Sequence, residues 1–86
     1  MDILFDPAKD ALNIAKHGLS LADAAEFEMA SAVVGIDDRY DYGEVRFRAF
    51  GRVEGDGRCL VFTWSGETIR AISYRRAREK EMRRHE

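Results

Sequence analysis

Residues 13–18 combine the side-chain types that proton transfer and phosphate binding require. The segment reads Asn-Ile-Ala-Lys-His-Gly and holds one of only two histidines of the chain, next to a lysine. A glycine directly after a helical segment supplies the left-handed backbone conformation that ends helices, so Lys16 and His17 should lie in a last helical turn. An imidazole there can titrate near neutral pH and exchange a proton. The alternative interpretation is that both cations only compensate the helix dipole.

A second group of candidates is rich in arginine. Arg46, Arg48 and Arg52 recur with a period of two around Phe50, so all four side chains should lie on one face of a strand. An exposed strip of arginines with an aromatic ring suits single-stranded nucleic acid, because guanidinium groups neutralise phosphates and the ring stacks on bases. The alternative is an ordinary solvent-facing side of a sheet.

Arg70 stands inside the otherwise apolar residues 69–74. An arginine in such a strand must reach water, a carboxylate or a phosphate, because burying its charge unpaired is costly. Glu44 and Glu67 are candidate ion-pair partners at the sheet edge. Glu44 follows Gly43 at the start of a strand, and it could act as a proton acceptor instead.

These candidates need a frame, and the sequence predicts the element order β-α-α-β-β-β-β-α. A short strand over residues 1–5 precedes a helix from Pro7 to Gly18, and the capping-box pattern of residues 20–23 starts a second helix through about residue 29. Strands are expected at residues 33–36, 45–53, 58–65 and 68–74, with a polar turn at residues 37–43 and a terminal helix from Arg75 onward. The fold class is therefore α+β, a small antiparallel sheet with two N-terminal helices and one C-terminal helix packed on it.

The strand at residues 58–65 shows the expected pattern of a core strand. Leu60, Phe62 and Trp64 alternate on one face and are expected in the hydrophobic core. Cys59 is expected to be a structural residue of the same strand.

Composition narrows the class of protein. The chain of 86 residues is 45% apolar, which suits a single domain, residues 1–86, with one modest core. The only cysteine excludes an intramolecular disulfide and fits a reducing cytosol. One cysteine and two distant histidines cannot assemble a zinc site, and no metal or cofactor is expected. Without a signal peptide or an apolar run of about eighteen residues, we expect a cytoplasmic protein without membrane contact.

The net charge of −2 hides an asymmetry between the two halves of the chain. Residues 1–44 contain three lysines or arginines and ten acidic residues, whereas residues 45–86 contain eleven and six. The basic residues of the second half are arginines apart from Lys80, and arginine is preferred where a planar group must grip a phosphate or a carboxylate. The asymmetry indicates one face for a polyanion and another for a different partner, with scattered solvated charges as the alternative.

Taken together and in order, the motifs resemble the BrnT family, the ribonuclease toxins of type II toxin–antitoxin modules whose domain has long been labelled DUF497. The resemblance covers essentially the whole chain. The matching blocks are Phe5-Asp6-Pro7-x-Lys9, Asn13-x-x-Lys16-His17-Gly18, Leu21-x-x-Ala24, Gly43-Glu44-x-Arg46, and Ile69-Arg70-x-Ile72-Ser73-x-Arg75-x-Ala77. Three positions depart from the family pattern: Phe5 replaces a frequent tryptophan, Leu21 a frequent phenylalanine, and His85 a frequent tyrosine.

The resemblance implies a RelE-like fold and an endoribonuclease that cleaves RNA without a metal ion and inhibits translation. It also implies neutralisation by a BrnA-type antitoxin that carries a ribbon-helix-helix DNA-binding domain. The complex would repress its own operon, so operator DNA would be contacted only through the antitoxin.

RNA carries its own nucleophile, the 2′-hydroxyl, so a ribonuclease needs only a base, an acid and cations for the charge of the phosphorane. On this hypothesis His17 or Glu44 takes the 2′-proton, Lys16 and Arg70 stabilise the phosphorane, and Arg75 grips the scissile or adjacent phosphate. The products would carry a 2′,3′-cyclic phosphate and a 5′-hydroxyl. Further RNA-binding residues are predicted at Lys9, Arg46, Arg48, Arg52, Tyr74 and His85.

The alternative is a catalytically weak or inactive module that binds RNA or the antitoxin and acts mainly as a co-repressor subunit. The acidic first half, the low net charge and His85 favour it, since free RNA-binding domains are usually basic. An unrelated α+β domain would require several ordered motif matches to coincide.

Overall fold

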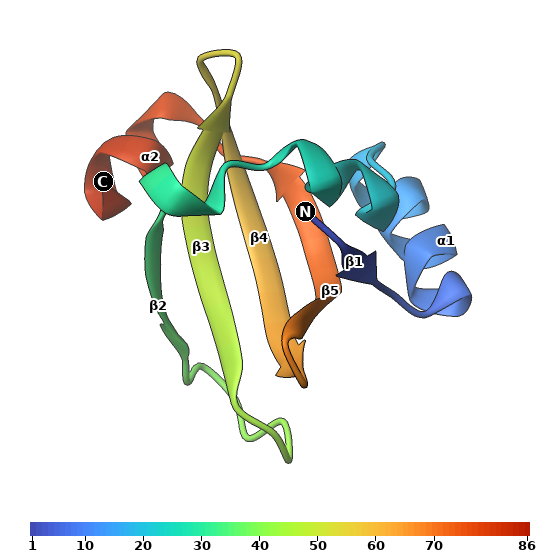
Figure 1. Ribbon diagram of the computed structural model, residues 1–86. Helices are drawn as coiled ribbons and strands as arrows, with labels where there is room; N and C mark the ends of the chain where they lie inside the picture. Colours follow the sequence, from blue (N-terminus) through green and yellow to red (C-terminus); the bar gives the residue numbers. More distant parts are fainter.

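The computed structural model describes all 86 residues, and a five-stranded sheet in the order β1-β5-β4-β3-β2 forms its frame (Figure 1). The strands are β1 (Ile3–Leu4), β2 (Val33–Asp37), β3 (Arg46–Val53), β4 (Asp56–Ser65) and β5 (Thr68–Arg76). Strands β2 to β5 pair antiparallel, whereas β1 pairs parallel with β5. The class is α+β as predicted, but the sheet is mixed, and the first strand is shorter than expected.

Two tight turns join the long strands of this sheet. Val53 pairs with Asp56, which leaves Glu54 and Gly55 as the two turn residues, at φ 50° and 85°. Positive φ at both central positions is the conformation whose twist matches a β-hairpin. A second two-residue turn, Gly66 and Glu67, joins β4 to β5.

Helix α1 (Pro7–His17) has the bounds that its local sequence predicts. The side chain of Asp6 accepts a hydrogen bond from the N–H of Ala8 at its start, and Pro7 occupies the first turn, where no N–H is needed. Gly18 ends the helix in the left-handed conformation, at φ 73°, and its N–H donates to the carbonyl of Ile14.

The second predicted helix is wrong in type, because two short 3₁₀ helices, η1 (Leu21–Glu26) and η2 (Met29–Ser31), take its place. The predicted capping box is present: the side chain of Ser20 caps η1, and the N–H of Ser20 donates to Asp23. Leu21, Ala24 and Phe27 recur every three residues and are all buried. A period of three places them on one side of a 3₁₀ helix, so this form turns all three toward the core.

The C-terminal helix also begins later than the sequence predicts. Arg75 and Arg76 extend β5 because Cys59 and Arg58 of β4 remain available as pairing partners. Helix α2 (Glu79–His85) follows after a short connection.

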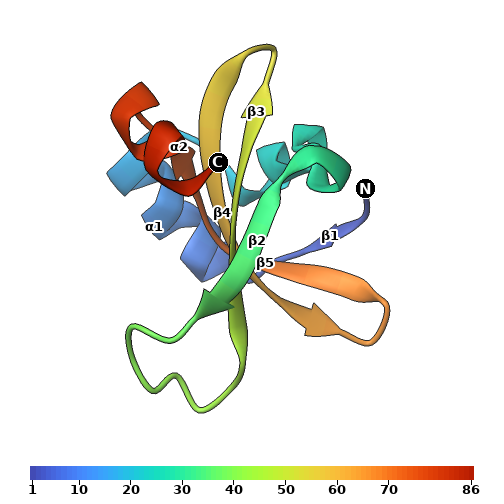
Figure 2. The ribbon, with the colours of Figure 1, turned by 90° about the vertical axis from the view of Figure 1, so that its left-hand side faces the viewer.

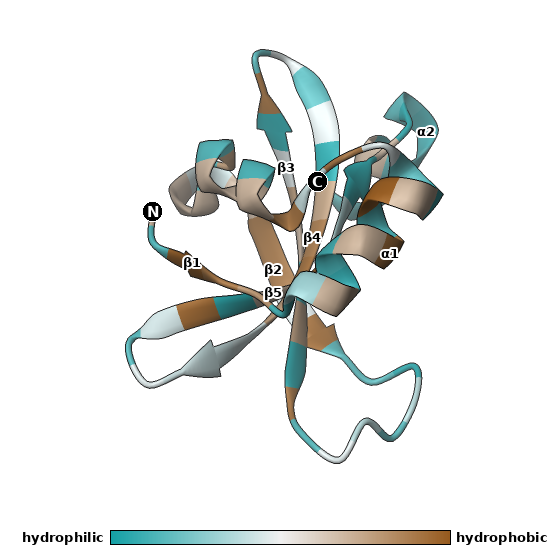
Figure 3. Ribbon diagram, turned by 90° about the vertical axis from the view of Figure 1, so that its right-hand side faces the viewer, coloured by the Kyte–Doolittle hydropathy of each residue, from teal (hydrophilic) through white to brown (hydrophobic).

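Figure 2 shows α1 and α2 on one side of the sheet and the 3₁₀ segments on the other, and Figure 3 gives the same arrangement from the opposite side. We call the side of α1 and α2 the helix-flanked face. The main core lies under the 3₁₀ segments, where Leu21 and Phe27 pack on residues of β3, β4 and β5. A smaller core of Phe50, Cys59, Ala77 and Met82 holds α2 against the helix-flanked face.

Trp64 is an exception to the predicted core. Its neighbours Leu60 and Phe62 are buried, whereas Trp64 is 54% exposed. It lies next to the β4–β5 turn, where its ring makes an edge-to-face contact with Phe62.

Candidate functional site

Strand pairing gathers the candidate arginines on the helix-flanked face. Directly paired residues point to the same side of a sheet, and so do residues two apart on one strand. The pairing places the following residues in three successive rows across this face: Val33, Phe50, Cys59 and Arg75; Gly35, Arg48, Val61 and Ser73; Asp37, Arg46, Thr63 and Arg70. With Arg52, two residues beyond Phe50, five arginines from two non-adjacent strands therefore share one face, as the period-two pattern predicts for those of β3.

At the α1 side of this face, Lys16 and His17 line a groove of about 260 Å³. Lys9 also lines it, together with Leu12, Asn13, Ile72 and Ser73. The pKa of His17 lies below its usual value of 6.5, because partial burial and the charges of Lys16 and Arg75 all disfavour the imidazolium. The groove therefore brings together three predicted site residues of α1, and His17 is neutral at pH 7.

A buried amide fixes α1 against the sheet. Asn13 Nδ2 donates to the carbonyls of Leu19 and Tyr74, at 2.7 and 2.8 Å, and its Oδ1 accepts from the N–H of Tyr74 at 3.1 Å. These bonds set the position of the last turn of α1 relative to β5, and hence of His17 relative to Arg75.

A second cluster surrounds Glu44. Its carboxylate accepts from Arg70 Nη2 at 2.8 Å and from Arg46 Nε at 3.1 Å, and the guanidinium of Arg46 lies 4.2 Å from the centre of the Tyr42 ring. The hydrogen bond from Arg46 and the charge of Arg70 lower the pKa of Glu44 below its usual value of 4.5. Arg70 therefore forms the ion pair with Glu44 that the sequence analysis gave as one alternative.

The structure separates the five residues that the sequence predicts to be catalytic into two groups. Lys16, His17 and Arg75 interact at one end of the face, whereas Glu44 and Arg70 form an ion pair at the other. Arg70 and Arg75 are five positions apart on β5, which corresponds to roughly 16 Å along a strand.

Helix α2 contributes to the first of these groups. Glu81 pairs with Arg75 through two hydrogen bonds of 2.8 Å, which lower the pKa of Glu81 and raise that of Arg75. His85 stacks on Phe50 with 4.0 Å between ring centroids and an interplanar angle of 3°. Phe50 itself is buried, so the expectation of an exposed aromatic ring within the arginine strip is wrong.

Other predicted RNA-binding residues differ in availability. Tyr74 is completely buried and its hydroxyl donates to Glu26, so it cannot stack on a base. Arg52 pairs with Glu79 and Glu86 of the C-terminal segment, at 2.6 and 2.8 Å. Arg48 has no carboxylate within 4.0 Å, and its guanidinium lies over the ring of Phe50.

One cation of this face was missed by the sequence analysis. Arg39 belongs to the predicted polar turn, but it reaches back and pairs with Asp37 at 2.7 Å. The Asp-x-Arg spacing in a turn is the only local signal for it, and the burial of Asp37 cannot be read from that spacing.

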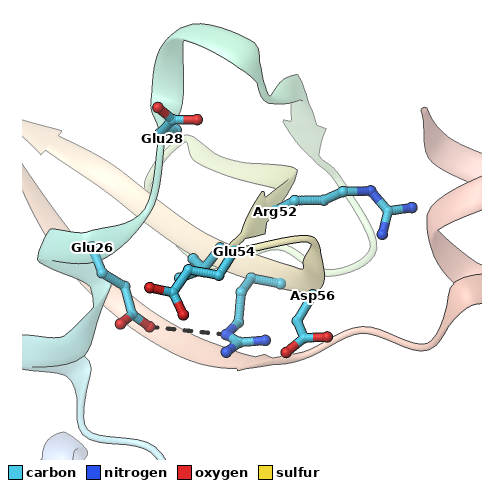
Figure 4. Close-up of a pocket in the computed structure, with 7 residues that line it drawn as sticks. Glu26, Glu28, Arg52, Glu54 and Asp56 are labelled. Atoms are coloured by element: carbon cyan, nitrogen blue, oxygen red, sulfur yellow. Dashed lines mark ion pairs between the residues drawn. The ribbon is translucent and has the colours of Figure 1, made fainter.

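The largest hollow of the molecule lies elsewhere, beside the β3–β4 hairpin (Figure 4). Its volume is about 500 Å³, and its lining includes four carboxylates, from Glu26, Glu28, Glu54 and Asp56. Of its two arginines, Arg58 lies near Glu26, at 3.9 Å, and Arg52 points away toward α2. The negative lining repels polyanions, so this hollow is not a phosphate site.

Two further observations describe the rest of the molecule. None of its helices combines the length and the apolar character that crossing a bilayer requires. No group of three or more His, Cys, Asp or Glu side chains is arranged to hold a metal ion.

Comparison with known proteins gives one family. A family model described as the ribonuclease toxin BrnT of type II toxin–antitoxin systems matches residues 5–81. No curated protein matches the chain significantly. The matched range includes every predicted site residue except His85.

Proposed function

The chain belongs to the BrnT family of ribonuclease toxins of type II toxin–antitoxin systems, and we propose that it cleaves RNA without a metal ion, through attack of the 2′-hydroxyl on the adjacent phosphorus. The observation that supports this most directly is the helix-flanked face, where a neutral imidazole lies beside Lys16 and Arg75 and further arginines continue along the sheet. Family membership implies an RNA substrate and an antitoxin partner. We also propose that the fold is of the RelE type, as the resemblance implies.

His17 is the better candidate for the general base. Glu44 accepts hydrogen bonds from two arginines, which lower its pKa and make it a weak base at neutral pH. The pKa of His17 is also lowered, but from 6.5, so its neutral form dominates at pH 7 and can accept the 2′-proton. The proton moves to the imidazole as the 2′-oxygen bonds to phosphorus; the bond to the 5′-oxygen breaks, and that oxygen takes a proton from water to give the 5′-hydroxyl.

Lys16 and Arg75 are placed to stabilise the phosphorane charge. Both lie close enough to His17 for their charges to lower its pKa. Two hydrogen bonds to Glu81 hold the guanidinium of Arg75 in a fixed orientation, which is what stabilisation without reorganisation requires. We assign Arg70, Arg46 and Arg48 to neighbouring phosphates of the strand, with Glu44 orienting the first two.

The test is RNA cleavage by the purified protein in EDTA, beside His17→Gln and Arg75→Ala. We expect products with 2′,3′-cyclic phosphate ends, no cleavage of a 2′-O-methyl RNA, and a loss of roughly two to four orders of magnitude for His17→Gln. Arg75→Ala should lose roughly two to three orders of magnitude. Arg70→Ala should also slow cleavage without unfolding the domain. Cleavage of 2′-O-methyl RNA, or full activity of His17→Gln, would contradict the mechanism.

We further propose that the antitoxin is of the BrnA type, with a ribbon-helix-helix domain through which the complex contacts operator DNA. The activity is then cytoplasmic, where RNA is translated. Co-purification with the product of a neighbouring reading frame tests this assignment, and operator binding by the isolated toxin would contradict it.

A second candidate function is a catalytically weak module that acts mainly as a co-repressor subunit. The observation that favours it is the pairing of Arg70 and Arg75 with carboxylates, because an occupied guanidinium is less available to phosphate. Expression without an antitoxin separates the two: growth arrest that His17→Gln relieves indicates an active toxin, and normal growth indicates the silent module.

A further inference from the structure

The end of β2 carries a buried carboxylate that the mechanism above does not use. Asp37 lies opposite Arg46 in the third row of the helix-flanked face, and only 4% of the residue is exposed. Its oxygens accept from Arg39 Nε at 2.7 Å, from Arg39 Nη2 at 2.8 Å and from the hydroxyl of Tyr42 at 3.2 Å. These hydrogen bonds lower the pKa of Asp37 to about 2, so it is ionised at any pH of interest.

The pairing holds one edge of the Arg39 guanidinium and leaves the other free. Nη1 has no hydrogen-bond partner within the domain, and 49% of the side chain is exposed. A guanidinium fixed on one side by a buried carboxylate loses little conformational entropy when the other side binds an anion. Arg39 is therefore preorganised, unlike an ordinary exposed arginine.

Arg39 lies close to the proposed RNA-binding residues of the helix-flanked face, because its partner Asp37 pairs with Arg46 across β2 and β3. The hydrogen bonds to Glu81 raise the pKa of Arg75, and the charge of Arg39 acts in the opposite direction, so the two guanidinium groups lie within electrostatic range of one another. Its partner Asp37 lies opposite Arg46 in the third row, so the guanidinium of Arg39 is held beside that row of the helix-flanked face. The free edge is thus available to a phosphate of an RNA strand bound on this face.

We propose that Arg39 binds a phosphate of the RNA strand on the helix-flanked face, and that Asp37 is the positioning residue that holds it there. This inference rests on the proposed function, since it takes RNA as the ligand. Tyr42 supports the arrangement, because its hydroxyl bonds Asp37 while its ring packs against Arg46.

The experiment measures binding of a fluorescently labelled 2′-O-methyl oligonucleotide, an RNA that the proposed mechanism cannot cleave, by anisotropy between roughly 50 and 200 mM KCl. For Arg39→Gln we expect roughly tenfold weaker binding, and a salt slope smaller by about 0.7, which corresponds to one phosphate contact on a single strand. Arg76→Gln is the matched control. It removes the same charge from the opposite side of the sheet, where Arg76 lies across from Arg58 in the pairing of β5 with β4, and it should leave the salt slope unchanged.

Two further variants separate binding from a purely structural role. Arg39→Lys keeps the charge but not the two-point bond to Asp37, so the salt slope should stay and the affinity fall only in part. Asp37→Asn makes the face more positive, and general electrostatics then predicts tighter binding. Positioning predicts weaker binding, because the guanidinium is no longer held.

Each outcome decides the inference. Equal slopes for the parent and Arg39→Gln, an equal loss for Arg76→Gln, or tighter binding by Asp37→Asn would overturn it. If the parent cleaves RNA while Arg39→Gln binds as the parent does, only this inference fails. If the parent neither binds nor cleaves RNA, the proposed function fails as well. Thermal melting of every variant identifies any loss that results from unfolding.

Discussion

The buried amide of Asn13 allows the sharpest test of how the site is positioned. Asn13→Ala removes three hydrogen bonds and leaves the N–H and carbonyl of Tyr74 and the carbonyl of Leu19 without their partner. A buried hydrogen bond contributes about 1 kcal/mol net, so we expect a loss of about 3 kcal/mol in the free energy of unfolding. In a domain of this size, that lowers the melting temperature by roughly 12–24 °C.

Urea unfolding and thermal melting measure this loss. Leu12→Ala is the matched control on the same helix: Leu12 is 70% exposed, so its truncation should change stability by less than about 0.5 kcal/mol. RNA cleavage at a temperature where Asn13→Ala remains folded should also fall, because α1 no longer holds His17 at a fixed position relative to Arg75.

Asn13→Asp adds a test of the hydrogen-bond directions. A carboxylate cannot donate to the two carbonyl oxygens that now lie 2.7 and 2.8 Å from Nδ2. Burial and these oxygens raise the pKa of the new carboxyl above its unfolded value, so the folded state binds more protons and stability rises as the pH falls. A loss below about 1 kcal/mol for Asn13→Ala, or no gain for Asn13→Asp on acidification, would refute the reasoning.

Three further predictions follow from the same structure. A Cβ at Gly57 would lie 2.5 Å from Met82 Cγ and 2.6 Å from the carbonyl oxygen of Ala77. Gly57→Ala should therefore lower the free energy of unfolding by roughly 1–3 kcal/mol and loosen α2. Gly35→Ala, with open space around the new Cβ, is the control in the same melting experiment. Lys16→Gln removes a charge that lowers the pKa of His17, so the imidazole resonances should titrate closer to 6.5 and the acid limb of the pH–rate profile should move to higher pH; an unchanged titration would contradict the assigned cause. The folded pKa of Asp37, about 2, is below its unfolded value of 3.8. The ionised carboxylate therefore contributes roughly 2 kcal/mol to the free energy of unfolding above pH 3.8, and this contribution is lost as the pH falls toward 2. Asp37→Asn should flatten this part of the curve of stability against pH, measured by urea titration.

The sequence pattern predicted which side chains share one face of a strand. It did not predict which elements pack on that face. The alternation of Arg46, Arg48 and Arg52 correctly placed them with Phe50 on one side of β3. Whether Phe50 is exposed depends on α2, which lies some thirty residues later in the chain and packs Met82 and His85 near it. Trp64 shows the converse, since it continues the apolar alternation of β4 and yet is more than half exposed.

The second helix shows how tertiary burial can decide between related local structures. Its capping box was recognisable because Ser20 and Asp23 interact across three residues. Its form depends on Leu21, Ala24 and Phe27 all reaching the main core, and the same spacing also fits the apolar side of an α-helix. The local signals alone could not separate the two.

The sequence by itself determined the start and end of α1, the capping box at Ser20 and the presence of Lys16 and His17 in a last helical turn, because each depends on interactions within a few residues. Only the tertiary structure decided which candidates share a site. Asn13 and Tyr74 are 61 positions apart, and Glu44 and Arg70 are 26 apart. These contacts arise from strand pairing and helix packing, so the division of the five predicted catalytic residues into two groups, and the pairing of Arg39 with a buried Asp37, follow from the folded chain alone.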